Sequence, residues 1–250
     1  ISSEADNSVV GTVFAGKIRV EATQSQKAVS FSEDSWKVIS KAIKTGEYPY
    51  QVGDTKEIDM GDLGTHTVRV ANTSSCTNGE TSETACGFVV EFADIISEHA
   101  MNSTDTNVGG WPASEMRTYV NGTVYNALPS DLQNVIVETT VVSGHDETSG
   151  ETNFTSSDKL YLLSTKEVSD SSDDTSSAET RQLDYYKNKG VTTSNCSEAI
   201  KQYNGSGSTL WLRSAYSYKA TFSGILGNGA CQFYTGATAI NGVSPAFRIA

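Results

Sequence analysis

Apolar residues in the first fifth of the chain are spaced as on one face of a helix. The spacing predicts a helix that Ser32 or Asp34 caps and Gly46 ends, with lysines on its solvent side. Its apolar positions are those of Trp36, Ile39 and Ile43. Upstream, a loose alternation of apolar residues over 9–20 predicts one or two short strands of an N-terminal lead.

Three strand-like runs follow the helix and predict an antiparallel meander. They lie around residues 57–60, 65–72 and 87–93. A second helix is expected to begin at Pro112, because the fixed φ of proline suits the first helical turn, and to run toward Gly122.

The later pattern predicts short elements separated by polar loops. Ser130 should cap a further helical turn, and residues 137–142 should extend as a strand. The polar run 143–157 predicts a loop, the apolar run 159–164 a compact strand, and the acidic, serine-rich run 169–179 a mobile excursion. Helices mixed with short antiparallel strands in this order indicate an α+β fold.

Composition and charge narrow the classes of function. The 250 residues carry a formal net charge of -12. Because affinity for nucleic acid or anionic lipid needs a basic surface, we expect no nucleic-acid partner. No run approaches the roughly 18 consecutive apolar residues of a membrane-spanning helix, so we expect no membrane insertion. The chain begins at Ile1 without a signal-like segment, which suggests that a targeting or anchoring segment has been removed.

Four cysteines are present, without the C-x-x-C spacing of zinc or thioredoxin-like sites. Cys76 and Cys86 flank a polar loop that a disulfide would close, and Cys196 and Cys231 are a possible second pair. Disulfides would favour an oxidising compartment.

Catalytic chemistry has little support in the pattern. The three histidines, His66, His99 and His145, do not lie beside a serine or cysteine in a known nucleophile motif. The aspartates of residues 169–179 lack the spacing of a calcium-binding loop. We therefore expect no enzymatic activity, no cofactor and no metal site.

The most informative segment lies near the C-terminus, where no acidic residue occurs between Ser214 and Ile240. Tyr, Phe, Ser, Thr, Gly, Ala and Asn dominate it. Such a composition is typical of recognition surfaces, in which rings give contact area and small polar residues give adaptable hydrogen bonds. On composition alone, an ordinary glycine-rich strand-and-turn region is an equal alternative.

The sequences that frame this insert carry a family resemblance. Trp-Leu-Arg-Ser at 211–214 and the stretch 242–249 resemble the framing motifs of the C-type-lectin-fold variable proteins that retroelements diversify in bacteria and phages. Motifs within 109–121 and 159–164 resemble an uncharacterised family of bacterial surface domains that often ends in such a cassette.

The resemblance implies a C-type lectin fold with two main helices, short antiparallel sheets and long irregular loops. In this family, randomised template adenines convert asparagine codons into a restricted set, to which most insert residues belong. The insert would then form a ligand-binding surface with aromatic hot spots. The implied binding residues are Tyr216, Tyr218, Thr221, Ser223, Asn228, Ala230, Phe233, Tyr234, Thr235, Thr238 and Ile240.

The resemblance also assigns framework roles. Trp211 and Phe247 would lie in the core, and Arg213 or Arg248 would pair with a buried carboxylate. It leaves open whether Cys231 is framework or a product of diversification.

We therefore expect a lead over residues 1–30 and one C-type-lectin-like domain over 31–250, with the variable cassette at 211–250. The expected function is receptor- or adhesin-type binding of a protein or glycan on a target surface. The protein would be secreted, displayed on a cell surface or carried on a phage particle. The alternative is a structural subunit of a pilus, tail fibre or surface layer, to which the lead would dock.

Overall fold

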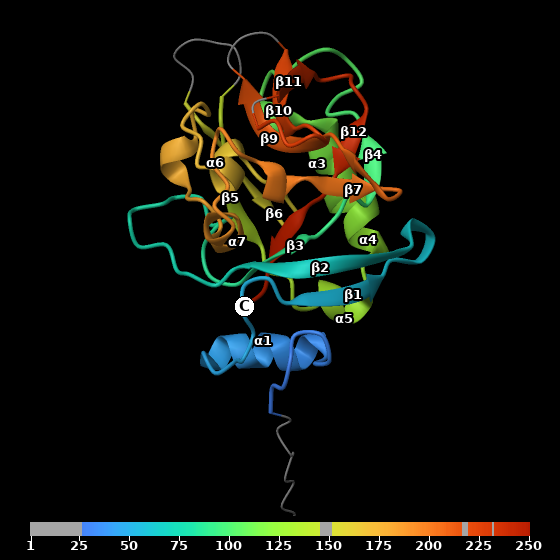
Figure 1. The fold of residues 1–250 in the computed structure, drawn as a ribbon, viewed down its shortest axis with the longest axis vertical. Helices are drawn as coiled ribbons and strands as arrows, with labels where there is room; N and C mark the ends of the chain where they lie inside the picture. The colour runs from blue at the N-terminus through green and yellow to red at the C-terminus, as the bar shows by residue number, and fades with distance from the viewer. Residues whose placement is uncertain (1–26, 146–151, 217–219, 232) are drawn as a thin grey trace, which may run out of the picture.

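The computed structural model describes residues 27–145, 152–216, 220–231 and 233–250. These residues form an α+β fold, as the sequence predicts, with helices packed around several small sheets (Figure 1). The predicted strands of the lead over 9–20 lie outside the described residues.

Helix α1 (Trp36–Thr45) lies at the end of the molecule where the C-terminus is found (Figure 1). The predicted helix is confirmed, and Gly46 ends it in the left-handed conformation with φ 71°. Its N-cap is Ser35, however, and neither Ser32 nor Asp34, because the Ser35 side chain accepts the hydrogen bond from the backbone of the first turn. The side chain of Asp34 instead binds the backbone of residues 29 and 30.

The first sheet contains the predicted meander and adds the C-terminal strand to it. Its order is β1-β2-β3-β13, and every pairing is antiparallel. Strand β13 pairs with β3, so that the end of the chain is held next to a strand that precedes it by more than 150 residues. The strands are β1 (Thr55–Asp59), β2 (Thr65–Asn72), β3 (Val89–Phe92) and β13 (Ala246–Arg248).

The second sheet carries the insert. Its order is β11-β10-β9-β12-β4, with β11 at one edge and β4 at the other. The pairings are antiparallel except that β12 runs parallel to β9. The strands are β4 (Ser97–His99), β9 (Leu210–Tyr216), β10 (Thr221–Ile225), β11 (Phe233–Gly236) and β12 (Asn241–Val243).

Two hairpins complete the strands, and one of them corrects the prediction. The run 143–157, predicted as a loop, contains the start of strand β6. The run 159–164, predicted as a strand, is instead a mostly buried connection with a single bridge to β13. The polar sequence of β6 hides its strand character, whereas residues 160–163 are apolar because they lie in the core. The hairpin strands are β5 (Thr139–Ser143), β6 (Phe154–Asp158), β7 (Lys201–Tyr203) and β8 (Ser206–Ser208).

The second predicted helix is a series of short helical pieces. It begins at Gly110, before Pro112, is interrupted at Ser114, and continues beyond Gly122 through a π-helical turn. The following turn has Pro129 as its N-cap, so Ser130 is its first residue and not its cap. The pieces are α2 (Gly110–Ala113), α3 (Glu115–Tyr119), η3 (Val120–Val124), α4 (Tyr125–Ala127) and α5 (Ser130–Gln133).

The segment 169–179, for which the sequence predicts a mobile excursion, is buried at some positions and exposed at others. The Asp174 side chain is buried and accepts hydrogen bonds from the backbone and hydroxyl of Ser176, at 2.7 and 2.6 Å. Ser171 is buried as well. Helical elements missed by the pattern here and elsewhere are η2 (Gly61–Leu63), α6 (Thr165–Ser169), η4 (Ser177–Glu179), α7 (Asp184–Asn188) and η5 (Ser197–Ala199).

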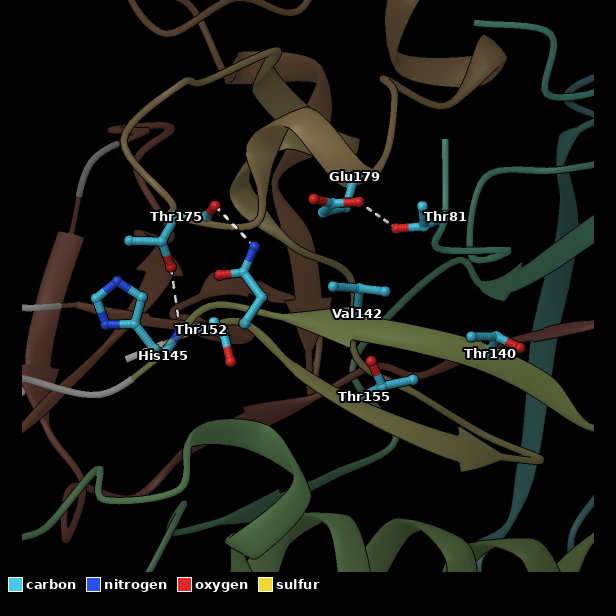
Figure 2. A pocket seen from close by; sticks show the side chains of 9 residues that line it. Thr81, Thr140, Val142, His145, Thr152, Thr155, Thr175 and Glu179 are labelled. Atoms are coloured by element: carbon cyan, nitrogen blue, oxygen red, sulfur yellow. Dashed lines mark hydrogen bonds between the residues drawn. The ribbon is translucent and has the colours of Figure 1, made fainter. Parts of the chain in front are cut away.

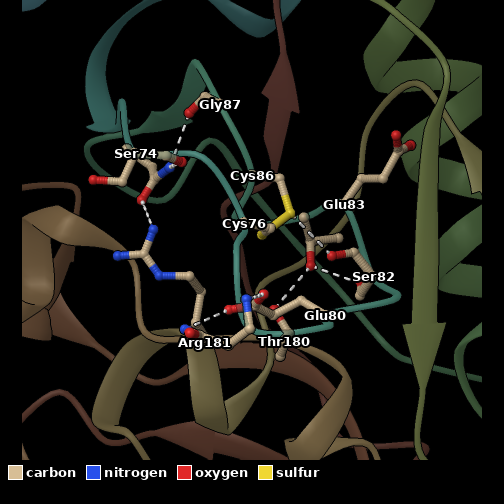
Figure 3. Close-up of a disulfide and its surroundings, with 12 residues drawn as sticks. Ser74, Cys76, Glu80, Ser82, Glu83, Cys86, Gly87, Thr180 and Arg181 are labelled. Atoms are coloured by element: carbon tan, nitrogen blue, oxygen red, sulfur yellow. Dashed lines mark hydrogen bonds between the residues drawn. A yellow bond between two sulfur atoms is a disulfide. The ribbon is translucent and has the colours of Figure 1, made fainter.

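One hydrophobic core joins both sheets, and it includes the buried cysteines Cys196 and Cys231. Trp111, Trp211 and Phe247 are fully buried in it, which confirms the predicted core positions of the latter two. Both cysteine pairs are bonded, Cys76 with Cys86 and Cys196 with Cys231, and Figure 3 shows the first beside Arg181. In the described parts of the chain, no helix is long and apolar enough to cross a membrane.

Candidate functional site

The strand that leads into the insert is fixed on both faces. The first six residues of β9 are buried, from Leu210 to Ala215. Arg213 has no exposed side-chain surface and forms a two-pronged ion pair with Glu167 of α6, with N–O distances of 2.5 and 2.6 Å. Glu167 also closes a capping box with Ser164 at the start of α6. The predicted pairing of an arginine with a buried carboxylate is thus confirmed for Arg213.

The charge state of this pair follows from its surroundings. Burial alone would raise the pKa of Glu167, but the Arg213 guanidinium and the hydrogen bonds to the carboxylate outweigh it, so the pKa lies below its ordinary value. Arg213 keeps its charge by the same attraction. The other predicted partner, Arg248, pairs with the partly exposed Glu83 at 3.1 Å.

A second buried charge cluster holds the first sheet against the β7–β8 hairpin. Glu91 of β3 binds Arg69 at 2.9 Å, Lys201 at 2.7 Å and the hydroxyl of Tyr186 at 2.8 Å. Burial lowers the pKa of Lys201 to about 8, although the attraction of Glu91 opposes this. We call the buried residues that surround the insert, including the Arg213–Glu167 pair and this Glu91 cluster, the frame.

The insert itself is exposed unevenly. Within β10, Phe222 and Ser223 are buried, so Ser223 does not lie on the surface with the other predicted ligand-binding residues. Thr221, at the start of the strand, is half-buried. Tyr218 lies outside the described residues, and Phe233 is placed only by its backbone in β11.

The remaining predicted binding residues lie at the end of β9, at the start of β10, on the edge strand β11 and in the turns beside it. Tyr216 and Tyr234 are half-buried and stack on one another, with ring centroids 4.1 Å apart and 27° between the planes. We call the surface formed by these residues the variable edge. Its described members are Tyr216, Thr221, Asn228, Ala230, Tyr234, Thr235, Thr238 and Ile240, of which Asn228, Ala230, Thr238 and Ile240 are exposed.

A framework carboxylate reaches the aromatic pair. The Tyr234 hydroxyl donates to Asp173 at 3.4 Å, although Asp173 lies 61 residues away in the sequence. Burial and the Asp173 charge raise the pKa of Tyr234 to about 12. The acid that the insert lacks in its own sequence is therefore supplied by the frame.

The frame holds the insert through the insert's main chain. The buried side chain of Asn107 donates to the carbonyl oxygens of Tyr216 and Thr221, at 2.8 and 3.3 Å, and so clamps both ends of the β9–β10 connection. The backbone N–H of Ala237 donates to Asp105 at 3.0 Å, and its carbonyl accepts from the backbone of residue 102 at 3.0 Å. None of these anchors uses a side chain of the insert.

Two further devices fix the turn between β10 and β11. The Cys196–Cys231 disulfide ties its far end to η5, so Cys231 serves as a structural anchor. A Cβ atom at Gly227 would lie 2.4 Å from the carbonyl oxygen of Gly207, because the turn packs directly on the β7–β8 hairpin. Only glycine permits that approach.

A polar pocket of about 630 Å³ lies between the β5–β6 hairpin and the segment that contains η4 (Figure 2). Val142 and Thr155 are direct cross-strand partners in this hairpin, and both line the pocket. Thr175 and Glu179 line it from the opposite side. The other lining residues are Thr81, Thr140, His145, Thr152 and Asn153.

The three histidines are dispersed, as their sequence positions suggest. His66 contacts the carbonyl of Leu63 at 2.7 Å, His99 stacks on Tyr119 at 4.3 Å, and His145 lines the pocket. Over the described ranges, no group of three or more His, Cys, Asp or Glu side chains is arranged to hold a metal ion.

Sequence reasoning missed the anchors Asp105 and Asn107, the acid Asp173 and the whole polar pocket. Single Asn and Asp residues in loops carry no periodic signal, and their role depends on which backbone atoms the fold brings near them. The threonines that line the pocket give no hydrophobic periodicity either. The only signal in the sequence that could have indicated these anchors is that Asp105 and Asn107 lie just before the Gly-Gly-Trp-Pro motif at 109–112.

Comparisons with known proteins give one match. No curated protein and no solved structure matches the chain. The model of a family described as a domain of unknown function (DUF6273) matches residues 89–250, well over half of the chain. This range contains β3, the whole second sheet, the β5–β6 hairpin and the Arg213–Glu167 pair. The chain therefore belongs to the family described as domain of unknown function (DUF6273).

Proposed function

We propose that this protein binds a ligand on a target surface, as a receptor or adhesin does, and that the variable edge sets its specificity. The observation that carries the proposal is the way the insert is anchored. Asn107 and Asp105 hold only backbone atoms of the insert, and the disulfide holds its remaining turn. Side chains of the variable edge can therefore change without loss of the contacts that position it.

The aromatic pair is the natural centre of binding. Tyr216 of β9 and Tyr234 of β11 present a half-buried aromatic stack, and the strand between them in the sheet, β10, is mostly buried. Tyrosine contributes large contact area for little lost side-chain entropy, and such residues dominate binding energy at protein surfaces. Exposed small residues on either side supply adaptable contacts.

We further propose a C-type-lectin-like scaffold diversified by a retroelement. Support comes from the α+β architecture, the framing motifs on β9 and β13, and the contrast between buried frame and exposed insert. The two disulfides suit a secreted, cell-surface or phage-borne protein, because such bonds persist in oxidising environments.

The flanking DNA tests the origin of the insert. We expect a reverse-transcriptase gene nearby and a template repeat that differs from the end of this gene mainly at adenines. A genome with neither would contradict diversification by a retroelement, while leaving the binding role open to its own test.

The binding role is tested by selection from a displayed library. Positions 228, 230, 234, 235 and 238 are randomised in the full chain, and the library is selected against hen egg-white lysozyme as an unrelated probe. We expect specific binders whose melting temperatures stay within a few degrees of the parent. A matched library randomised at five buried positions of β9 and β10 should yield few folded members.

Two outcomes would count against the proposal. The edge library could yield no binder, or its members could unfold as often as those of the buried library. Either result would favour the alternative of a structural subunit, in which the edge serves assembly.

A further inference from the structure

The polar pocket has a composition that restricts what it can bind. Among the described residues that line it, Val142 is the only aliphatic one, and His145 and Glu179 are the only ones with titratable side chains. Its volume of about 630 Å³ is within the range of ligand sites, but most such sites are mainly apolar. An apolar ligand would therefore find too little contact area here.

The walls of the pocket are held by hydrogen bonds between them. The Thr81 hydroxyl donates to the Glu179 carboxylate, and the backbone of residues 81 and 82 donates to the Glu179 carbonyl at 3.1 and 2.9 Å. Across the pocket, the Asn153 amide donates to the Thr175 carbonyl at 2.9 Å and the His145 backbone donates to its hydroxyl at 3.1 Å (Figure 2). The site is thus preorganised without help from a ligand.

Polar atoms remain for a ligand after these bonds are made. The hydroxyls of Thr152 and Thr155 make no hydrogen bond to any other described residue, and both side chains are exposed. Asn153 keeps its amide oxygen, because its bond to Thr175 uses the nitrogen. Each threonine also offers a methyl group beside its hydroxyl, and Val142 adds a small apolar floor.

This pattern of alternating hydroxyl and methyl groups matches a saccharide. A sugar ring presents hydroxyls that both donate and accept, together with C–H faces that need modest apolar contact. A multivalent anion would meet the Glu179 carboxylate, and the described pocket residues provide no set of ligands for a metal ion. We infer that this pocket binds a neutral saccharide unit.

The pocket lies next to the variable edge along one short segment of chain. Asp173 contacts the hydroxyl of Tyr234, and Thr175, two residues later, lines the pocket. One glycan could therefore place a sugar in the fixed pocket while its continuation reaches the edge. This last step rests on the proposed function, whereas the pocket itself does not.

Binding of free glycosides to the full chain tests the inference. The probes are the methyl glycosides of glucose, galactose, mannose, N-acetylglucosamine and N-acetylgalactosamine, titrated into ¹⁵N-labelled protein. We expect at least one to shift the amide signals of pocket residues such as Thr155 and Thr175. Thr155→Val and Thr152→Val should each weaken that glycoside about tenfold, the effect of one lost hydrogen bond.

Controls separate the pocket from the fold and from the edge. Thr123→Val, at an exposed threonine in η3, should leave the affinity unchanged, and Thr155→Trp should block binding by filling the pocket. The double variant Tyr216→Ala/Tyr234→Ala should still bind the glycoside, even if it abolishes binding by the edge. Absence of shifts with all five probes, binding unaffected by Thr155→Trp, or loss of binding in the tyrosine double variant would each overturn the inference.

Discussion

Strands β9 and β11 belong to the same sheet but use their side chains in opposite ways. In β9 the first six residues are buried and Arg213 is paired inside the core, so most positions are determined by their neighbours. In β11, two positions away in the sheet, Tyr234 and Thr235 are half-buried and the strand is held by its backbone and the adjoining turns. The sheet thus combines a fixed strand with a replaceable one.

The difference shows how stability and recognition are kept apart in one element. A buried side chain contributes by the area and charge that it shares with fixed neighbours, so its replacement costs several kcal/mol. A side chain on an exposed edge contributes little to folding, and substitutions there are usually within about 0.5 kcal/mol. Variants that remove frame contacts and edge contacts separately test this contrast.

The largest effect is expected at the buried ion pair. Glu167→Gln leaves the Arg213 guanidinium charged and buried without its counter-ion, so we expect unfolding free energy to fall by about 3–5 kcal/mol. The exposed pair Lys189–Glu198 is the matched control, and Glu198→Gln should cost less than about 1 kcal/mol. Urea denaturation at pH 7 measures both, and equal costs would contradict the assigned role of β9.

Acid should remove most of the advantage that Glu167 gives. Its pKa in the folded protein lies below the ordinary value of 4.5, so the pair contributes fully above that pH. As the pH falls, the unfolded chain takes up the proton first, and stability is lost until the folded carboxylate is protonated too. The difference between the parent and Glu167→Gln should therefore shrink between pH 5 and pH 3, measured by urea denaturation. A constant difference would mean that the charge of Glu167 is not what stabilises the pair.

The sequence predicts the frame better than the edge for a physical reason. The first helix and the meander follow from hydrophobic periodicity, which reports burial directly. The family resemblance, and not periodicity, placed Trp211 and Phe247 in the core, where both are buried. Strand β6 is missed because its polar residues do not alternate with apolar ones. The partial burial of the run 169–179 has no hydrophobic signal, because there Asp174 binds the backbone and hydroxyl of Ser176 inside the fold.

Some residues of the candidate site were predicted from the sequence, and others were not. The family resemblance pointed to Tyr216 and Tyr234, whose rings stack on one another in the structure. The same set included Ser223, which is the direct cross-strand partner of Tyr234 but is buried, so membership of the insert does not by itself indicate exposure. The anchors at Asp105 and Asn107 depend on tertiary proximity, which one sequence does not encode in any local pattern.

The two disulfides should differ in what they contribute. By chain entropy, the loop of 35 residues closed by Cys196–Cys231 stabilises by about 3.8 kcal/mol and the loop of 10 residues closed by Cys76–Cys86 by about 2.7 kcal/mol. Replacement of both cysteines by serine should therefore lower the unfolding free energy more for Cys196–Cys231 than for Cys76–Cys86, as urea denaturation would measure. Replacement of Cys196 and Cys231 should also weaken ligand binding, because this disulfide holds the turn that leads into β11. Equal effects on binding would show that the edge does not need this anchor.

A smaller loss is expected from the clamp at Asn107. Asn107→Ala removes the donor to two carbonyl oxygens of the β9–β10 connection, and we expect a cost of about 1–3 kcal/mol. Asn188→Ala, at an exposed residue of α7, is the control and should change stability by less than about 0.5 kcal/mol. Hydrogen exchange of the amides in residues 215–222 should speed up in the first variant only. Unchanged exchange there would show that the connection is held by something other than Asn107.

The smallest effect is expected when side chains of the edge are exchanged. Asn228→Ser, Ala230→Ser, Thr235→Ser and Thr238→Ser together alter exposed or half-buried positions and leave the backbone anchors made by Asn107 and Asp105 in place. We expect a total change in unfolding free energy below about 1 kcal/mol, because each site makes few fixed contacts. Binding selected on the parent edge should nevertheless be lost, since the contacting atoms have changed. If stability fell as far as it does in Glu167→Gln, the edge would belong to the core, and the contrast between β9 and β11 would not hold.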